Sequence, residues 1–525
     1  MKKLYMTAIA LMGAISMHAQ GWPADYEGVM LQGFYWNSYR ASKWQKLEAQ
    51  ADDLAPYFSL VWIPQSANCG SGRSMGYDDL YWFNNYNSSF GNEAELRSMI
   101  RTFRNKGIGT IADVVINHRN TLTSWTDFPV ETYKGVTYRM YPADICHDDD
   151  EGNTYNWANS QTPKVSLSNK YDSGDGWNGI RDLDHYSSNV QTVVKAYLDM
   201  LLNDLGYAGF RYDMVKGYAG LFTGIYNSAA KPRFSVGEYM DGNATTVKAW
   251  INATKVNGEP TSAAFDFPVR YAVRDLIASK WSGKAKEGLA SDPTYRRYAV
   301  SFVENHDTEY RSSSEQQDPI RQDTLAANAY ILASCGTPCV FYKHWLAYPT
   351  DIKMMINARH AAGIANTSNT TFNEYTGSQC NVLKTEGSHG TLYAVMGANA
   401  DAYKAPAGFT EILRGHNYRY LLSNSSNVAW VDLPSGRYDN VQKARLTAVS
   451  DQQGAQLVYT TDGTLPTAQS RKAASGTLID IPTGTTTLNV GLLVGTTVSA
   501  VATRTYQISP SDSFSPYDIT VNVNV

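Results

Sequence analysis

The chain has few cysteines and little charge. Only five of its 525 residues are cysteine, an odd number scattered from Cys69 to Cys380, which excludes a disulfide-stapled scaffold. Charged residues make up 18% of the chain and its net charge is −4, so the electrostatic attraction that nucleic acid binding needs is missing. The apolar stretch from Leu4 to Met17 is too short to be favoured as a membrane span.

The amino terminus has the pattern of a secretory signal. Lys2 and Lys3 form a short basic region, the apolar stretch follows, and His18 with Ala19 leads to a cut before Gln20. We therefore predict a signal peptide over residues 1–19 and a secreted mature protein, either extracellular or periplasmic. An ordinary N-terminal helix is the alternative interpretation.

Four separated segments are apolar runs that end in acidic, basic or amide residues. They are DVVINH (113–118), GFRYDMVK (209–216), VGEY (236–239) and FVENHD (302–307). A strand buried in a parallel sheet has a nearly continuous hydrophobic sequence, and in a barrel of such strands the chemistry lies at their carboxyl ends. The four segments should therefore deliver polar groups to one place.

Apolar runs alternate with amphipathic segments through most of the chain. Eight strands are expected, at 28–36, 60–64, 108–115, 208–213, 234–238, 263–267, 299–305 and 338–342. Helical patterns lie between them, at 42–55, 93–106, 190–205, 269–279, 323–334 and 351–362. This order predicts an α/β fold, a (β/α)₈ TIM barrel over residues 20–365, with a doubly wound sheet as the weaker alternative.

One connection interrupts this alternation. Residues 117–184 contain no clean helical pattern and are rich in Asp, Asn, Gly and Tyr. A structureless loop of that length is uncommon in a compact domain. We predict a small inserted domain after the third strand, which projects from the face that carries the chemistry.

Three of the strand ends carry a carboxylate, namely Asp213, Glu238 and Asp307. A single acid after a strand is usually a helix cap, but three of them facing one cleft suit the cleavage of a glycosidic bond, which needs a pair of acids. Arg211 precedes Asp213 by two residues, so both side chains point to the same face of a strand. The guanidinium should hold Asp213 ionised, while a second acid near negative charge keeps its proton.

The four segments resemble, in order and interval, the conserved regions of the α-amylase family, glycoside hydrolase family 13. The resemblance covers roughly residues 28–423. It implies a retaining mechanism in which Asp213 is the nucleophile, Glu238 the general acid and then base, and Asp307 the residue that stabilises the distorted sugar and the transition state. The segments MGYDD, VGEY and GTPCVFYKHW are most similar to plant and archaeal α-amylases.

The same resemblance implies further contacts of the substrate and one cofactor. It assigns sugar contacts or orienting roles to Tyr77, His118, Arg211, Lys216 and His306, and it makes Asp113 a structural partner of Arg211. It also implies a calcium ion, which takes six to eight oxygen ligands. The implied ligands are the side chains of Asn117, Asp172 and Asp182 with the carbonyls of Asp175 and Gly217; solvated turn acids are the alternative.

The part of the chain after the barrel is predicted to be all β. Residues 366–425 alternate in short strands and resemble the antiparallel C-terminal domain of the family, and a linker is expected at 423–436. Residues 437–509 predict a small β-sandwich, and LVYTTDGTLPT is similar to the chitobiase C-terminal module, which has an immunoglobulin-like fold. Residues 510–525 are expected to be a linker and the possible start of a further domain.

Together with the resemblance, these patterns lead us to expect a secreted, monomeric, endo-acting α-amylase. It would hydrolyse the α-1,4 bonds of starch or related α-glucans with retention and would use Ca²⁺ structurally. A glucan transferase with the same residues is the alternative, because acceptor choice depends on the shape of the cleft. A glycan-binding protein without activity is disfavoured, because all three acids are present.

Overall fold

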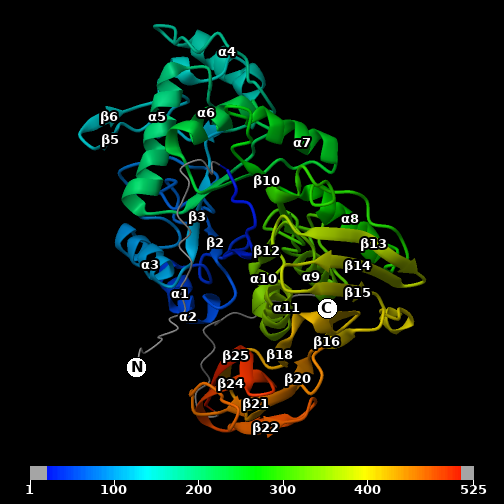
Figure 1. The fold of residues 1–525 in the computed structure, drawn as a ribbon. Coiled ribbons are helices and arrows are strands. Elements are labelled where there is room, and N and C mark those ends of the chain that lie inside the picture. Colours follow the sequence, from blue (N-terminus) through cyan, green and yellow to red (C-terminus); the bar gives the residue numbers. More distant parts are fainter. Residues whose placement is uncertain (1–20, 510–525) are drawn as a thin grey trace.

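The barrel is the centre of the molecule (Figure 1). A computed structural model describes residues 21–509, so the predicted signal peptide and the segment 510–525 lie outside the described residues. Eight parallel strands close in the order β1-β12-β11-β10-β9-β8-β3-β2. All eight lie within or overlap the predicted ranges: β1 (Met30–Gln32), β2 (Leu60–Ile63), β3 (Gly109–Val114), β8 (Gly209–Tyr212), β9 (Phe234–Gly237), β10 (Ala263–Phe265), β11 (Ala299–Phe302) and β12 (Thr337–Phe341). The predicted TIM barrel is confirmed.

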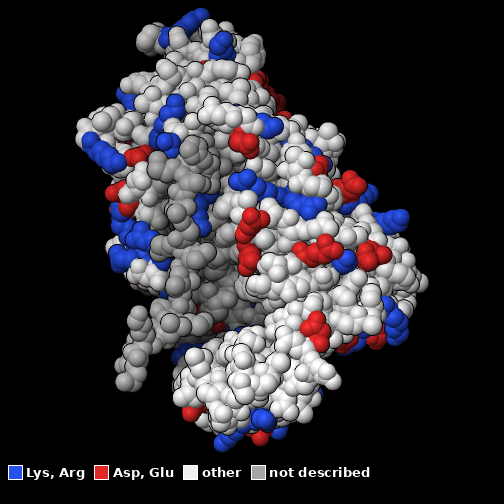
Figure 2. Space-filling model, in the orientation of Figure 1, with Lys and Arg blue, Asp and Glu red and all other residues white. Residues whose placement is uncertain are grey.

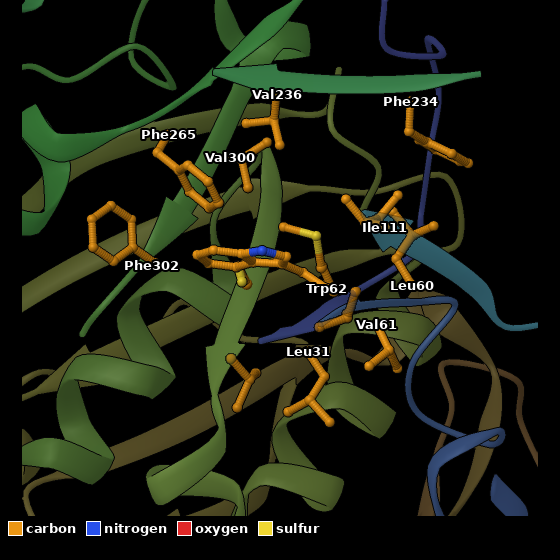
Figure 3. Packing of buried hydrophobic residues seen from close by; sticks show 14 of the residues in the cluster. Leu31, Leu60, Val61, Trp62, Ile111, Phe234, Val236, Phe265, Val300 and Phe302 are labelled. Carbon is orange, nitrogen blue, oxygen red and sulfur yellow. The ribbon is translucent and has the colours of Figure 1, made fainter. Parts of the chain in front are cut away.

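The strands have apolar sequences because both of their faces are buried. Every residue of β2, β8, β9 and β11 is buried, and Trp62 points into the barrel, where side chains from several strands surround it (Figure 3). Its ring lies 5.3 Å from the ring of Phe265. The barrel is therefore a packed core, and only its carboxyl end is open to chemistry.

Helices cover the outside of the barrel. The predicted ones are α1 (Trp44–Ala49) with α2 (Ala51–Leu54), α3 (Glu93–Asn105), α5 (Ser188–Asp199), α8 (Phe267–Ala278), α9 (Thr324–Ala333) and α11 (Pro349–Ala362). A capping box of Asn92 and Glu95 begins α3, and a π-helical turn over 200–205 ends α5. The sequence patterns missed α6 (Gly220–Ala230), α7 (Ala244–Ala253) and the short α10 (Tyr342–Ala347).

The segment between β3 and α5 projects from the barrel, with α4 (Asn153–Ser160) at its far end (Figure 1). It contains the pairs β4 (His118–Arg119) with β7 (Arg181–Asp182) and β5 (Glu131–Tyr133) with β6 (Val136–Tyr138). The expectation of no helix was wrong, because α4 lies in this segment. Its sequence, NTYNWANS, is too polar and too short to show a helical period.

Two further β units follow the barrel. A five-stranded antiparallel sheet contains β13 (Asn369–Gly377), β14 (Cys380–Glu386), β15 (Thr391–Met396), β16 (Phe409–Gly415) and β17 (Tyr418–Ser423). A C-terminal module over 428–508 has two sheets, one of β18 (Val428–Val431), β20 (Gln442–Val449) and β23 (Leu478–Ile481), the other of β19 (Gly436–Tyr438), β21 (Gln456–Thr460), β22 (Arg471–Ala473), β24 (Gly484–Val494) and β25 (Thr497–Ile508). Strand β18 lies inside the range 423–436, where a linker was expected. The module therefore begins within that range.

The module packs on the barrel beside α2 and α11 (Figure 1). Both Tyr57, which precedes β2, and Lys353 of α11 donate a hydrogen bond to the carbonyl of Ser435, at 3.3 Å each. Trp430 of β18 is buried in the same apolar cluster as the barrel. The exact division of the chain into domains stays a prediction.

Charges of both signs lie on the visible face of the molecule (Figure 2). On the face shown in Figure 2, acidic and basic side chains are interspersed over the barrel, and the module exposes few of either sign. Within residues 21–509, no helix is long and apolar enough to cross a membrane.

Candidate active site

The carboxyl ends of four barrel strands bring the predicted acids together. Asp113 lies in β3 and is in register with Arg211 of β8. Asp213 directly follows β8 and Glu238 directly follows β9, while Asp307 lies in the loop that follows β11. The strand geometry therefore places each polar group, and the apolar runs beneath keep it at the edge of the core.

One guanidinium binds three of these carboxylates. Nη1 of Arg211 lies 2.6 Å from Asp113 Oδ1 and 2.6 Å from Asp213 Oδ1, and Nη2 lies 2.8 Å from Glu238 Oε2. The first two pairs were predicted, whereas the contact with Glu238 was not. Arg211 is almost fully buried, and the ring of Trp62 lies 4.8 Å from its guanidinium carbon.

Burial controls the protonation of the two central acids. It raises the pKa of Glu238 to about 8, with Arg211 opposing the shift and Asp213 adding to it. It raises the pKa of Asp213 to about 7, again against the pull of Arg211. The expectation that Arg211 simply holds Asp213 ionised is therefore corrected, because the loss of solvent outweighs the ion pair.

Glu238 also has an oxygen that is not engaged. Its Oε2 accepts a hydrogen bond from the backbone N–H of Met214 at 3.1 Å and contacts Arg211. Its Oε1 is buried and has no hydrogen-bond partner among the described residues. Because a buried polar atom is costly to leave unpaired, this oxygen is suited to bind a group of a substrate.

Tyr77 and His306 form one wall beside these acids. The Tyr77 hydroxyl donates to Asp113 Oδ2 at 3.1 Å and lies 2.6 Å from His306 Nε2, and the two rings are stacked with centroids 5.2 Å apart. His306 Nε2 lies 3.1 Å from Asp307 Oδ2. Burial lowers the pKa of His306 to about 4, so the ring is neutral and can hydrogen-bond without carrying charge.

The remaining predicted contacts lie on the side of the inserted segment. His118 Nε2 lies 2.8 Å from the carbonyl of Tyr77, and its ring stacks on Trp177, which is 48% exposed. Lys216 lies 3.6 Å from an Asp175 oxygen and over the ring of Tyr239. Lys216 thus contacts Asp175 and Tyr239, and among the described residues the structure does not join it to the Arg211 cluster.

Sequence reasoning missed four side chains around the acids. Gln32 Nε2 lies 3.0 Å from His306 Nδ1, and Trp62 Nε1 donates to Asp113 Oδ2 at 3.1 Å. Trp36 has its ring parallel to Tyr77, and Arg311 lies over Trp36, 4.0 Å from the ring centroid. Trp36 lies at the end of the first predicted strand, so the pattern used for the other strands could have found it.

The predicted calcium ligands gather where the insertion meets the barrel. The ladder of β4 with β7 pairs His118 with Asp182, and Asn117 Nδ2 donates to Asp182 Oδ1 at 3.1 Å. A Cβ added to Gly176 would lie 3.3 Å from Asp182 Oδ2 and 4.0 Å from Asp172 Oδ2, so both carboxylates face one spot. Asp172 Oδ2 is buried without a partner among the described residues.

The backbone at the two other predicted ligands, Asp175 and Gly217, lies close to these side chains. The amide of Asp175 donates to the Lys216 carbonyl at 2.9 Å, and an added Cβ at Gly217 would overlap the side-chain oxygen of Asn117. This set of oxygen donors fits calcium. Only two of the predicted side-chain ligands are carboxylates, and within residues 21–509 no group of three or more His, Cys, Asp or Glu side chains is arranged to hold a metal.

The fold and the acid cluster are those of a barrel enzyme that cleaves glycosidic bonds. Residues 64–227 match the family described as "Alpha amylase, catalytic domain", and residues 433–505 match "Chitobiase/beta-hexosaminidase C-terminal domain". These matches identify an α-amylase catalytic domain, of the kind found in glycoside hydrolase family 13, in the barrel part of the chain and a chitobiase-type module near its carboxyl end.

Curated relatives are similar in sequence, and a solved structure is similar in fold. "Probable alpha-amylase 2" of Arabidopsis thaliana is 28% identical over 62% of this chain and 78% of its own length. "Glucan 1,4-alpha-maltotetraohydrolase" of Roseateles saccharophilus is 28% identical over 74% of this chain and 71% of its own length. The fold is similar to that of a γ-CGTase from alkalophilic Bacillus clarkii, with a TM-score of 0.57 at 13% identity over 94% of this chain and 98% of that one.

Proposed function

We propose that this protein is an endo-acting α-amylase that hydrolyses α-1,4 bonds of starch-like glucans with retention. The observation that supports it most is that Asp213 and Glu238 share one guanidinium, that of Arg211. Retaining glycosidases hold their two carboxyl groups about 5 Å apart, whereas inverting ones leave room for water between them at about 6.5–9.5 Å. Two carboxylates on one guanidinium favour the shorter separation.

In this mechanism each of the three acids has its own role. Asp213 attacks the anomeric carbon and forms a covalent glycosyl intermediate, while Glu238 gives its proton to the leaving glycosidic oxygen. Glu238 then takes a proton from water, whose oxygen displaces Asp213 and restores both groups. Asp307 stabilises the positive charge that develops on the sugar ring. Tyr77, His118 and His306 would contact the sugar at the point of cleavage, and Lys216 would contact it beyond that point.

We propose Ca²⁺ as a structural cofactor. Asn117, Asp172 and Asp182 would bind it with side-chain oxygens, and Asp175 and Gly217 with their carbonyls. When bound, the ion supplies positive charge between two carboxylates and cross-links the insertion to the barrel. It braces the wall of the cleft and takes no part in bond cleavage.

Three further parts of the hypothesis rest on the sequence. Secretion after removal of residues 1–19 stays a prediction, because these residues lie outside the described part. The monomeric state and the exclusion of nucleic acid partners also stay predictions.

The decisive experiment measures products from soluble starch and from a maltooligosaccharide of defined length. Hydrolysis predicts new reducing ends in proportion to cleavage, with a mixture of chain lengths early in the reaction. Longer chains without net new reducing ends would show that the enzyme is a transferase. A single short product from the first minutes would contradict endo-action. The relatives named maltotetraohydrolases make this second measurement necessary.

Retention is tested by proton magnetic resonance of the first product. Retention predicts that the α anomer appears first and then equilibrates. An initial β anomer would contradict the roles of Asp213 and Glu238, even if starch is cleaved.

A further inference from the structure

Asp307 is the least constrained of the three acids at the cleft. Asp213 and Glu238 are buried and bonded to Arg211, whereas the Asp307 side chain is 32% exposed. The contacts of its carboxylate are His306 Nε2 at 3.1 Å and Arg311 Nη2 at 3.5 Å. A residue whose role depends on the position of its charge therefore lies on a loop and needs other groups to orient it.

Arg311 is well placed to orient this acid. Its Nη2 donates to the carbonyl of His306 at 2.6 Å and reaches the Asp307 carboxylate four residues back along the same loop. The side chain is only 15% exposed. Its guanidinium lies over the ring of Trp36 at 4.0 Å. Arg311 thus hydrogen-bonds the backbone just before Asp307, and its own position is fixed by the ring of Trp36.

A buried ion pair holds Trp36 in turn. Glu309 Oε1 accepts a hydrogen bond from the Trp36 backbone N–H at 2.6 Å, and Glu309 Oε2 forms an ion pair with Lys343 Nζ. Lys343 also donates to the carbonyl of Tyr310 at 3.0 Å. The Glu309 side chain is 1% exposed, so leaving either charge without its partner would be costly.

The barrel order explains why these three segments meet. Strand β12 lies between β1 and β11. Trp36 follows β1, Lys343 follows β12 at the start of α10, and Glu309 and Arg311 follow β11. The Glu309–Lys343 pair therefore joins the loops of three adjacent strands at the end of the barrel that carries the acids.

We propose that Arg311 is a positioning residue for Asp307, and that Trp36, held by the Glu309–Lys343 pair, is the platform that fixes Arg311. The inference rests on the proposed function, because it assumes that Asp307 acts on the transition state. Arg311 itself need not touch the substrate. Its removal should lower the rate of the chemical step more than it weakens binding of the substrate.

Arg311→Met tests this with a side chain of similar reach and no charge. We expect kcat on a maltooligosaccharide of defined length to fall by at least about tenfold, with KM within about threefold of wild type. Arg311→Lys should recover part of kcat. Arg321→Met is the matched control, because Arg321 lies over the ring of Tyr310 on the same loop and is exposed. It should leave kcat unchanged.

A double mutant shows whether Arg311 acts through Asp307. In an Asp307→Asn background, Arg311→Met should cause almost no further loss of kcat, because the charge that it positions is gone. Equal losses in both backgrounds would overturn the inference, as would a kcat of Arg311→Met equal to that of wild type.

The same set of variants separates the two hypotheses. If the wild-type protein does not cleave α-glucans, the proposed function fails. If wild type cleaves them and Asp307→Asn is inactive while Arg311→Met is fully active, only the positioning role fails. A thermal unfolding midpoint of Arg311→Met within about 2 °C of wild type excludes loss of fold as the cause of a lower kcat.

Discussion

At the scale of single residues, Arg211 holds three carboxylates of the site together. The strand period predicted that Arg211 and Asp213 share a face, and this could be predicted because side chains alternate along a strand. The contact of Arg211 with Glu238 joins neighbouring strands β8 and β9, and no local pattern in the sequence reports it. The pKa of Asp213 could not be predicted either, because it depends on burial by residues from the whole barrel.

This arrangement predicts the pH dependence of the reaction. In the proposed mechanism Glu238 must start protonated. Its pKa is raised to about 8 by burial, so kcat/KM should fall as pH rises through about 8. Asp213 must start ionised, and burial raises its pKa to about 7, so kcat/KM should also fall as pH decreases below that value. The two limbs belong to the coupled pair. The measurement is kcat/KM across the acidic, neutral and alkaline range.

The alkaline limb is the sharper test. A limb close to 4.5, the ordinary value for a glutamic acid, would contradict the effect of burial on Glu238. Glu238→Gln is the control, since it should reduce kcat/KM by at least about a hundredfold and remove the alkaline limb from any activity that remains.

At the scale of elements, the eight strands could be predicted because burial on both faces leaves a simple sequence signature. The insertion was less predictable. Its short strands, such as β4 and β7, contain only two residues each, and α4 is polar. These elements are held by long-range contacts, for example that of Asn117 with Asp182, 65 residues away. The resemblance could therefore suggest the candidate ligands, whereas their spacing in the sequence could not identify them.

Gly217→Ala tests the proposed calcium site. The added Cβ would overlap the Asn117 side chain, which is buried and cannot move aside cheaply. We expect a loss of about 1–3 kcal/mol of stability from overpacking. Calcium should raise the thermal midpoint of wild type above its value in a chelator, and the variant should lose most of this gain.

A control glycine separates the two effects. Gly72→Ala should behave like wild type, since a Cβ at that position meets no atom within 4 Å. If wild type melts at the same temperature with calcium and with a chelator, the ion has no structural role.

At the scale of the whole molecule, the C-terminal module is joined to the barrel by more than the chain. Its own core contains residues such as Leu457 and Val490, yet Trp430 of β18 packs in the barrel cluster. Serine, asparagine, proline and glycine in the preceding segment predicted a linker, and that prediction was wrong. Composition reports local flexibility, whereas the burial of Trp430 depends on a surface distant in sequence.

The shared core predicts that barrel and module unfold together. Wild type should show one calorimetric transition, and Trp430→Ala, at a cost of about 3–5 kcal/mol, should split it into two. Leu457→Ala, inside the module's own core, should lower the single transition without splitting it. Both variants should cleave a short maltooligosaccharide at the wild-type rate, because the module's hydrogen bonds to the barrel part, from Tyr57 and Lys353, involve none of the clustered acids. Two transitions in wild type would contradict the coupling.

The contacts of Arg211 have one consequence for selectivity. Arg211 faces Asp113, Asp213 and Glu238, and Arg311 faces Asp307, so with Glu238 protonated three carboxylates still face two guanidinium groups. This excess of negative charge stabilises any bound sugar whose ring becomes positively charged. An uncharged sugar is stabilised in this way only while its glycosidic bond is breaking. The barrel therefore builds its preference for the activated sugar into the protein itself, before any glucan arrives.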